Sequence, residues 1–220
     1  METNWGARRN ESAIEKLPVT TSIAVTKLGL AGDEQADVIH GGAGQALYAY
    51  AREDLDWWSE RLNRPLRDGM FGENLTLRGF DVSGALLAER WRIGNVLAEV
   101  TAPRMACGTF GAWMREKQWG PTFNATRRPG AYLRVLEEGE LSPGDGVEVV
   151  WRPDEHVTVA EGVAGILGDE DVLRRIAVLS KQVPEWDFEA VMLHAWRRAK
   201  SAARRKQEAL SGTGGEKTHA

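Results

Sequence analysis

The stretch ERWRIGNVLAEVTAPRMAC, residues 89–107, contains two strand-like runs on either side of the turn-forming pair Gly94 and Asn95. Similar short runs bounded by glycine recur between Thr20 and Arg152: TSIAVTKL, QALYAYA, ENLTLRGF, ALLAERWRI, VLAEVTAP, AYLRVLEEG and VEVVWR. Many short strands with regular turn signals favour a sandwich or barrel over a parallel α/β sheet. The sequence therefore predicts a mainly β fold, a closed or partly closed barrel over residues 18–152.

One helix is expected to interrupt the strands. In REDLDWWSERLN, residues 52–63, the apolar Leu55, Trp58 and Leu62 recur at i, i+3 and i+7. Polar and charged residues occupy most other positions, which is typical of an amphipathic helix with one buried face.

A small helical unit is expected after the barrel, over residues 156–206. Thr158 and Glu161 have the spacing of a capping box, Asp169 is placed to cap a second helix, and Pro184 suits the first turn of a third. Three helices of about 45 residues bury too little apolar surface to stand alone, so the unit should dock on the barrel or on a second subunit. Residues 1–17 are expected to form a flexible arm, and residues 207–220 a disordered tail.

Composition indicates a soluble cytoplasmic protein. The chain is 42% hydrophobic and 27% charged, and its one cysteine cannot form an internal disulfide, which suits a reducing compartment. No signal peptide and no apolar run near the ~20 residues of a membrane span is evident, so no membrane association is predicted. The net charge of −4 argues against nucleic acid as a partner, and the basic cluster near the C-terminus is interpreted as a solvated helix end.

Cys107 is the first candidate functional residue. A lone free cysteine is commonly an inert buried side chain. The alternative is a thiolate, which needs a nearby cation or metal, and Arg104 lies three residues away. Both interpretations stay open on local pattern.

Two further segments carry candidate site residues. His40 precedes Gly41 and Gly42, where backbone could approach an anion while the imidazole donates a proton, or where local carbonyls simply satisfy the histidine. Glu73 and Asn74 follow a glycine turn and either orient a ligand in a cavity or bond to nearby backbone. The histidines show no metal-ligand spacing and there is no CxxC, so a zinc site built from protein alone is not predicted.

Taken together, five blocks resemble the MOSC domain, named for the C-terminal domain of molybdenum cofactor sulfurases. The likeness runs from about Thr21 to Trp151 and is greatest to the stand-alone bacterial branch linked to hydroxylaminopurine resistance, in which a three-helix unit often follows the barrel. The blocks are GLAGDEQADVIHGG, YAYAREDLDWW, GMFGENLT, ERWRIGNVLAEVTAPRMAC and PGAYLRVLEEGELSPGD.

The resemblance implies a barrel that binds molybdenum cofactor (molybdopterin), with Cys107 as the metal ligand. A soft thiolate suits a molybdenum that already carries dithiolene sulfurs. The implied reaction is two-electron reduction of an N-hydroxylated small molecule, such as an N-hydroxylated nucleobase. The expected proton carriers are His40 and Glu73, and the expected cofactor-binding residues are His40, Gly41, Gly42, Asn74, Arg104 and Cys107.

The implied reductase needs electrons from outside, because no flavin or iron–sulfur motif is present. A flavoprotein or ferredoxin-type donor is therefore expected, and a homodimer is possible. The chain departs from the family pattern at Gln45, Asn95 and Ala106, where a basic residue, an aspartate and a proline are usual. Two alternatives remain: a non-catalytic carrier of the cofactor or of sulfur, and an enzyme with Cys107 as nucleophile and His40 as base.

Overall fold

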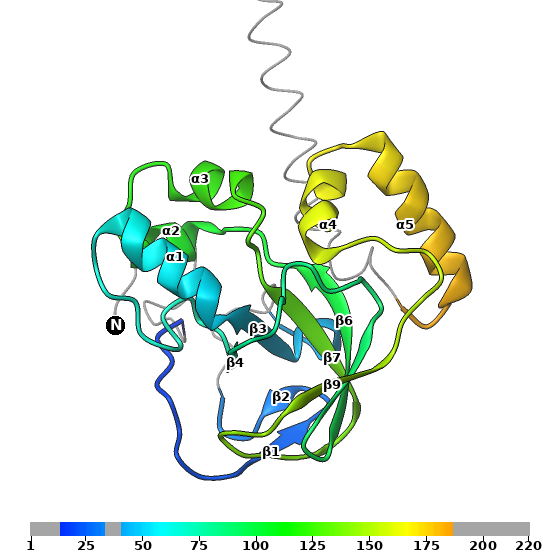
Figure 1. The fold of residues 1–220 in the computed structure, drawn as a ribbon, viewed down its shortest axis with the longest axis horizontal. Helices are drawn as coiled ribbons and strands as arrows, with labels where there is room; N and C mark the ends of the chain where they lie inside the picture. Colours follow the sequence, from blue (N-terminus) through cyan, green and yellow to red (C-terminus); the bar gives the residue numbers. More distant parts are fainter. Residues whose placement is uncertain (1–13, 34–40, 187–220) are drawn as a thin grey trace, which may run out of the picture.

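The computed structural model describes residues 14–33 and 41–186, which form two β-sheets flanked by helices (Figure 1). The larger sheet has six strands in the order β4-β3-β7-β6-β5-β9, and only the β3–β4 pair is parallel. Its strands are β3 (Leu47–Ala51), β4 (Leu75–Leu77), β5 (Arg90–Ile93), β6 (Val96–Pro103), β7 (Ala131–Glu137) and β9 (Val147–Trp151). The smaller sheet has the order β2-β1-β8, from β1 (Ile23–Thr26), β2 (Gly29–Leu30) and β8 (Gly139–Leu141).

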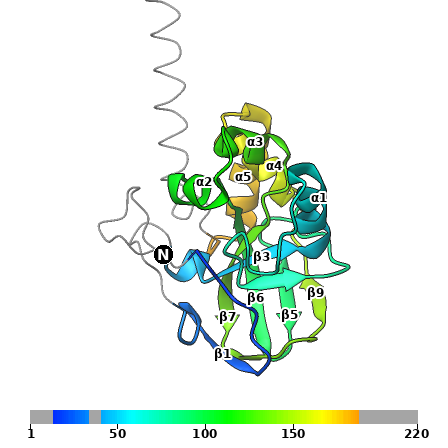
Figure 2. The same cartoon turned by 90° about the vertical axis from the view of Figure 1, so that its left-hand side faces the viewer.

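The larger sheet curls into a half-barrel, which confirms the predicted mainly β architecture. Helices α1 (Arg52–Leu62), α2 (Gly108–Met114) and α3 (Trp119–Ala125) lie at one end, and α4 (Val159–Ile166) and α5 (Glu170–Gln182) lie beside them (Figures 1 and 2). A short 3₁₀ helix, η1 (Ala43–Gln45), precedes β3.

The β5–β6 hairpin explains why the quoted stretch organises the sheet. Ile93 pairs with Val96 across the turn, and Gly94 adopts a φ of 51°. The expected strand at residues 85–93 begins only at Arg90. Upstream of it, Ala88 has a φ of 66°, and the Leu87 N–H donates to the carbonyl of Val157.

Two hydrophobic clusters fill the interior, and β3 belongs to both. Alternate side chains of a strand point to opposite faces, so Leu47 and Ala49 join the first cluster while Tyr48 and Tyr50 join the second. The first cluster lies inside the half-barrel and beneath α4 and α5. The second is rich in aromatic rings and lies beneath α1, α2 and α3.

Helix α1 forms where the apolar spacing predicts it. Leu55 and Trp58 are fully buried, and the helix ends at Asn63 in the left-handed conformation. Helices α2 and α3 have no counterpart in the sequence prediction. Each has seven residues and contains glycine, which disfavours helix, so packing of Phe110, Trp119 and Phe123 in the second cluster stabilises them.

Helices α4 and α5 pack their apolar side chains into the first cluster, together with those of the larger sheet. The capping box of Thr158 and Glu161 is present, and the Asp169 side chain accepts from the N–H groups of Asp171 and Val172. The Trp186 indole N–H donates to the carbonyl of Val100 on β6 at 3.1 Å. The unit therefore docks on the barrel, one of the two arrangements that the sequence left open.

Several predicted segments fall outside the described residues. The proposed third helix lies there beyond Trp186, as do the tail at 207–220 and residues 1–13 of the arm. At the end of the arm, Ile14 packs against the second cluster and the Lys16 carbonyl accepts from Arg67.

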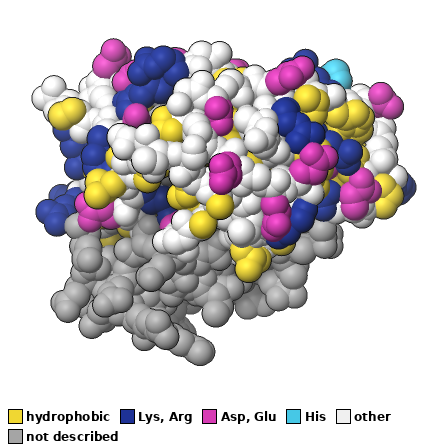
Figure 3. Space-filling view, turned by 90° about the horizontal axis from the view of Figure 1, so that it is seen from below, with side chains coloured by type: hydrophobic (Ala, Val, Ile, Leu, Met, Phe, Trp, Pro, Cys, Tyr) yellow, Lys and Arg dark blue, Asp and Glu magenta, His cyan; other side chains and the backbone are white. Residues whose placement is uncertain are grey.

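The surface carries charges of both signs. Figure 3 shows cationic and anionic side chains interspersed on the face beneath the sheets. Among the described residues, no helix combines the length and apolar character needed to cross a membrane.

Candidate functional site

The candidate site lies where β6 ends and α2 begins. β6 terminates at Pro103, and Cys107 is the N-cap residue of α2, with its Sγ accepting from the Phe110 N–H at 3.4 Å. The Cys107 side chain is partly exposed rather than sealed in the core, and it packs at the edge of the aromatic cluster.

A hydrogen bond from the loop to α3 restrains the residue before Cys107. The sequence pattern has Ala106 where the family usually has proline, which removes a constraint on the backbone. In the structure, the Ala106 N–H donates to Asn124 Oδ1 at 3.2 Å, a bond that proline could not form. Asn124 thus restrains the loop that carries the cysteine.

Arg104 lies buried behind this loop. Its side chain is wedged between two rings, with Cζ 4.7 Å from the Tyr48 ring centroid and 4.4 Å from that of Phe110. One guanidinium nitrogen donates to the carbonyl of Phe71. Only 8% of the residue is exposed, so Arg104 acts as a fixed buried cation rather than a mobile surface arm.

Arg104 remains charged in this position. Burial acts to lower its pKa, but four ionisable neighbours act in the opposite direction, and the pKa lies above its usual value. These neighbours are Tyr132, Tyr48, Cys107 and Glu73. The guanidinium therefore places a permanent positive charge near the cysteine sulfur, as a thiolate requires. Its predicted direct contact with a cofactor phosphate stays a prediction.

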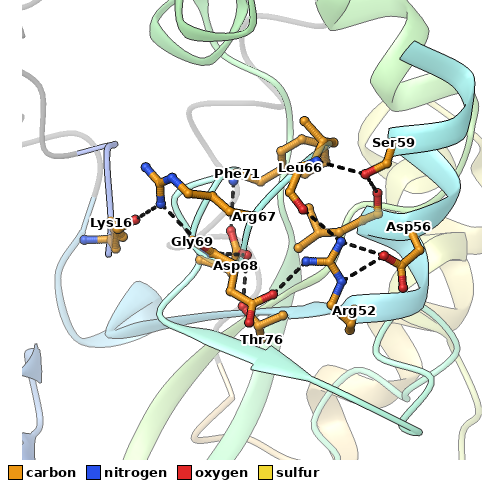
Figure 4. A network of polar contacts seen from close by, with 12 residues as sticks. Lys16, Arg52, Asp56, Ser59, Leu66, Arg67, Asp68, Gly69, Phe71 and Thr76 are labelled. Carbon is orange, nitrogen blue, oxygen red and sulfur yellow. Dashed lines mark hydrogen bonds and ion pairs between the residues drawn. The ribbon is translucent and has the colours of Figure 1, made fainter. Parts of the chain in front are cut away.

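Glu73 closes the loop that holds Arg104. It is 3% exposed and accepts from the N–H groups of Gly69 at 2.7 Å and Phe71 at 2.9 Å, and from the Thr76 hydroxyl at 3.0 Å. Figure 4 shows Gly69, Phe71 and Thr76 around this loop, whose neighbours include Arg52 and Lys16. Burial raises the pKa of Glu73, and these hydrogen bonds act to lower it.

Asn74 ties β4 to its neighbours. Its Oδ1 accepts from the Tyr48 N–H at 2.9 Å, and its Nδ2 donates to the Asp33 carboxylate at 2.7 Å. Of the two interpretations of Asn74, the structure displays the bond to nearby backbone. Its predicted role in binding the cofactor stays a prediction.

The His40-Gly41-Gly42 motif is only partly described. His40 lies outside the described residues, so its pairing with Cys107 stays a prediction. Gly41 and Gly42 have φ values of 137° and 83°, in the range that favours glycine. A Cβ on Gly42 would meet no atom within 4 Å, so replacing this glycine would cost free energy through its positive φ and not through a steric clash.

The sequence analysis missed the tyrosines of the site. Tyr48 on β3 faces Tyr132 on β7 across the strand pair, with ring centroids 5.3 Å apart. The signal was present in the alternation of β7, where Ala131 and Leu133 are fully buried while Tyr132 points to the opposite face.

No cluster of three or more potential metal ligands of the His, Cys, Asp and Glu types occurs within residues 14–33 and 41–186. A metal bound through Cys107 would therefore need further ligands from a bound group, from water or from residues outside those ranges.

Residues 36–148 match the MOSC domain family, and the chain belongs to it. It is 31% identical to YflK of Bacillus subtilis over 156 residues, which is 70% of this chain and 71% of YflK. It is 32% identical to YiiM of Escherichia coli over 157 residues, 70% of each chain.

A solved structure and a longer relative extend this comparison. The crystal structure of YiiM from Geobacillus stearothermophilus has a TM-score of 0.65 at 29% identity, covering 74% of this chain and 80% of that one. A protein of Gibberella moniliformis named as a reductase is 30% identical over 146 residues, 64% of this chain but only 26% of that longer protein.

Proposed function

We propose that this MOSC protein is a reductase of N-hydroxylated compounds that holds molybdenum cofactor through Cys107. The observation that supports the proposal most is a partly exposed sulfur at a restrained helix N-cap, close to the buried charge of Arg104. A longer relative, of which the matched region is 26%, is named as a reductase, and this name is in line with the proposal.

The described residues fit a group that supplies most of its own metal ligands. One thiolate donor is available at the site, and a sulfur-rich metal centre needs only one more thiolate. Metal binding displaces the thiol proton, and Arg104 favours the resulting anion. Gly41 and Gly42 both have positive φ, a backbone conformation compatible with the backbone-lined anion site predicted from the sequence.

In this proposal, each residue has a defined task. The cofactor, when bound, supplies the two-electron redox chemistry. Cys107 anchors the group through Sγ, and the Phe110 N–H fixes the direction of that sulfur. Arg104 maintains the charge of the thiolate, while Glu73 holds the loop whose Phe71 carbonyl positions Arg104. Electrons come from a separate flavoprotein or ferredoxin-type donor in the cytoplasm.

The decisive experiment measures molybdenum in protein purified from cells that make the cofactor. We expect a stoichiometric amount in the wild type and a loss of at least tenfold in Cys107→Ser. Met105→Leu is the matched control, since it changes the other sulfur of the same loop at nearly constant volume and should retain the metal. A wild-type protein without molybdenum, obtained from such cells, would contradict the proposal.

A second measurement separates enzyme from carrier. Reduced viologen dye supplies electrons, and an N-hydroxylated nucleobase is the substrate. We expect turnover that disappears in Cys107→Ser. Molybdenum without turnover would instead support the carrier, and metal-free turnover that requires Cys107 would support the cysteine nucleophile.

A further inference from the structure

Tyr132 differs from the other tyrosines of the chain in what its hydroxyl contacts. The chain has three tyrosines, and all three lie on the β3–β7 pair. The Tyr48 hydroxyl donates to the Pro129 carbonyl and that of Tyr50 to the Arg128 carbonyl, each at 2.8 Å. The Tyr132 hydroxyl has no hydrogen-bond partner among the described residues, and its side chain is partly exposed.

The strand register places Tyr132 beside the candidate site. Tyr132 pairs with Ala102 on β6, two residues before Arg104, and Cys107 follows on the same loop. Tyr132 and Cys107 both pack at the margin of the aromatic cluster. Tyr132 and Cys107 therefore lie on the same margin of this cluster, and both interact electrostatically with Arg104.

The electrostatic surroundings suit a proton donor. Burial raises the pKa of Tyr132, Arg104 acts to lower it, and Cys107 acts to raise it. The phenol therefore stays protonated at neutral pH, while the adjacent cation stabilises the phenolate that forms after proton transfer. A group that carries a proton and tolerates its loss meets the requirement for a general acid.

We propose that the Tyr132 hydroxyl donates the proton that the departing oxygen takes up when an N-hydroxylated compound is reduced beside Cys107. This inference rests on the proposed function. The N–O bond of R₂N–OH breaks with the uptake of two electrons and two protons, giving R₂N–H and water. The electrons come from the external flavoprotein or ferredoxin-type donor. Tyr132 supplies one proton and water the other, and the phenolate is reprotonated from solvent.

Kinetics of the loaded protein test the role directly. In Tyr132→Phe we expect kcat to fall about 100-fold with KM within about threefold of wild type, because positioned acids contribute roughly 10²–10⁴ in rate. The remaining rate should fall as pH rises, since solvent must supply the proton. Tyr50→Phe is the matched control: it also loses one hydroxyl from β3–β7, and it should retain kcat per molecule of molybdenum.

A titration of the cofactor-free protein tests the placement without turnover. Tyrosinate absorbance should show one tyrosine ionising before the other two, since the Tyr48 and Tyr50 hydroxyls donate to main-chain carbonyls, and hydrogen bonds of this kind favour the protonated phenol. This first step should be absent in Tyr132→Phe. It should move to higher pH in Arg104→Gln and stay near wild type in Arg104→Lys.

The outcomes separate the two proposals. An active wild type whose Tyr132→Phe variant keeps full kcat and an unchanged pH profile would overturn the role of Tyr132 and leave the reductase intact. A first ionisation that persists in Tyr132→Phe would overturn the placement. A molybdenum-loaded wild type that reduces no N-hydroxylated substrate would remove the proposed function and, with it, this inference.

Discussion

Gly130 is the position where a single added methyl group should damage the tyrosine side of the barrel most. Its φ is 65°, and a Cβ there would lie 2.5 Å from the Ala49 carbonyl oxygen, 2.6 Å from Tyr50 Cδ2 and 2.9 Å from Tyr48 Cε2. Ala49 is held by pairing to β4 and β7, so its carbonyl cannot retreat. Gly130→Ala therefore combines backbone strain with a clash against fixed backbone.

The size of the effect follows from two contributions. The left-handed conformation costs a non-glycine residue about 1–2 kcal/mol, of which about 0.4–1 kcal/mol is offset by a more restricted unfolded chain. Overpacking adds about 1–3 kcal/mol. We expect Gly130→Ala to lower the free energy of unfolding by about 3 kcal/mol.

A matched glycine isolates the clash. Gly79 has a φ of 71°, and a Cβ there would meet nothing within 4 Å. Gly79→Ala should therefore cost about 1 kcal/mol, the strain alone. The assay is urea unfolding followed by tryptophan fluorescence. If the free energies of unfolding of the two variants differ by less than about 0.5 kcal/mol, the close approach of the Gly130 backbone to β3 is refuted.

Three more predictions follow from contacts described above. Thr158→Ala should lower the free energy of unfolding by about 1 kcal/mol in the same assay, because it removes the side-chain cap of α4; an unchanged midpoint would contradict this. Asn124→Ala should raise the rate of iodoacetamide alkylation of Cys107 in cofactor-free protein about twofold or more, by releasing the Ala106 N–H, and an unchanged rate would show that Asn124 restrains nothing. Burial raises the pKa of Asp54 against the opposing effect of its ion pair with Arg128. A carboxyl with a raised pKa in the folded state contributes stability at low pH, and this stability is lost as pH rises. Between about pH 4 and 7 the free energy of unfolding should therefore fall more in wild type than in Asp54→Asn. Parallel plots of the free energy of unfolding against pH for the two proteins would refute this.

The sequence predicted those elements whose pattern is local. The period of Leu55 and Trp58 predicts α1, and the turn at Gly94 predicts the hairpin at its centre. Helices α2 and α3 were not predicted, because each is short and contains glycine. Burial of their aromatic side chains in the second cluster stabilises them as helices. A tertiary cause of this kind leaves no periodic signal in seven residues.

The same distinction holds for the site. Cys107 and Arg104 are near each other in sequence, and the structure keeps both at the end of β6. For Glu73 the sequence left open a ligand in a cavity or a bond to nearby backbone, and the structure displays hydrogen bonds to the N–H groups of its own loop. Its role as a proton carrier stays a prediction. Two glycines with positive φ in GMFGENLT signal a turn that needs an internal acceptor, which is the clue that local pattern offered. Tyr132 required the strand register, which no short motif contains.

The C-terminal helices are attached to the barrel in two ways. The Trp186 indole donates a hydrogen bond to the β6 backbone, and Val159 and Leu179 are buried in the first cluster. The C-terminal helices serve as a wall of the half-barrel. A chain shortened at the end of β9 would open its interior to water and should aggregate, and a graft of these helices from a relative would succeed only with the facing β6 residues transferred as well.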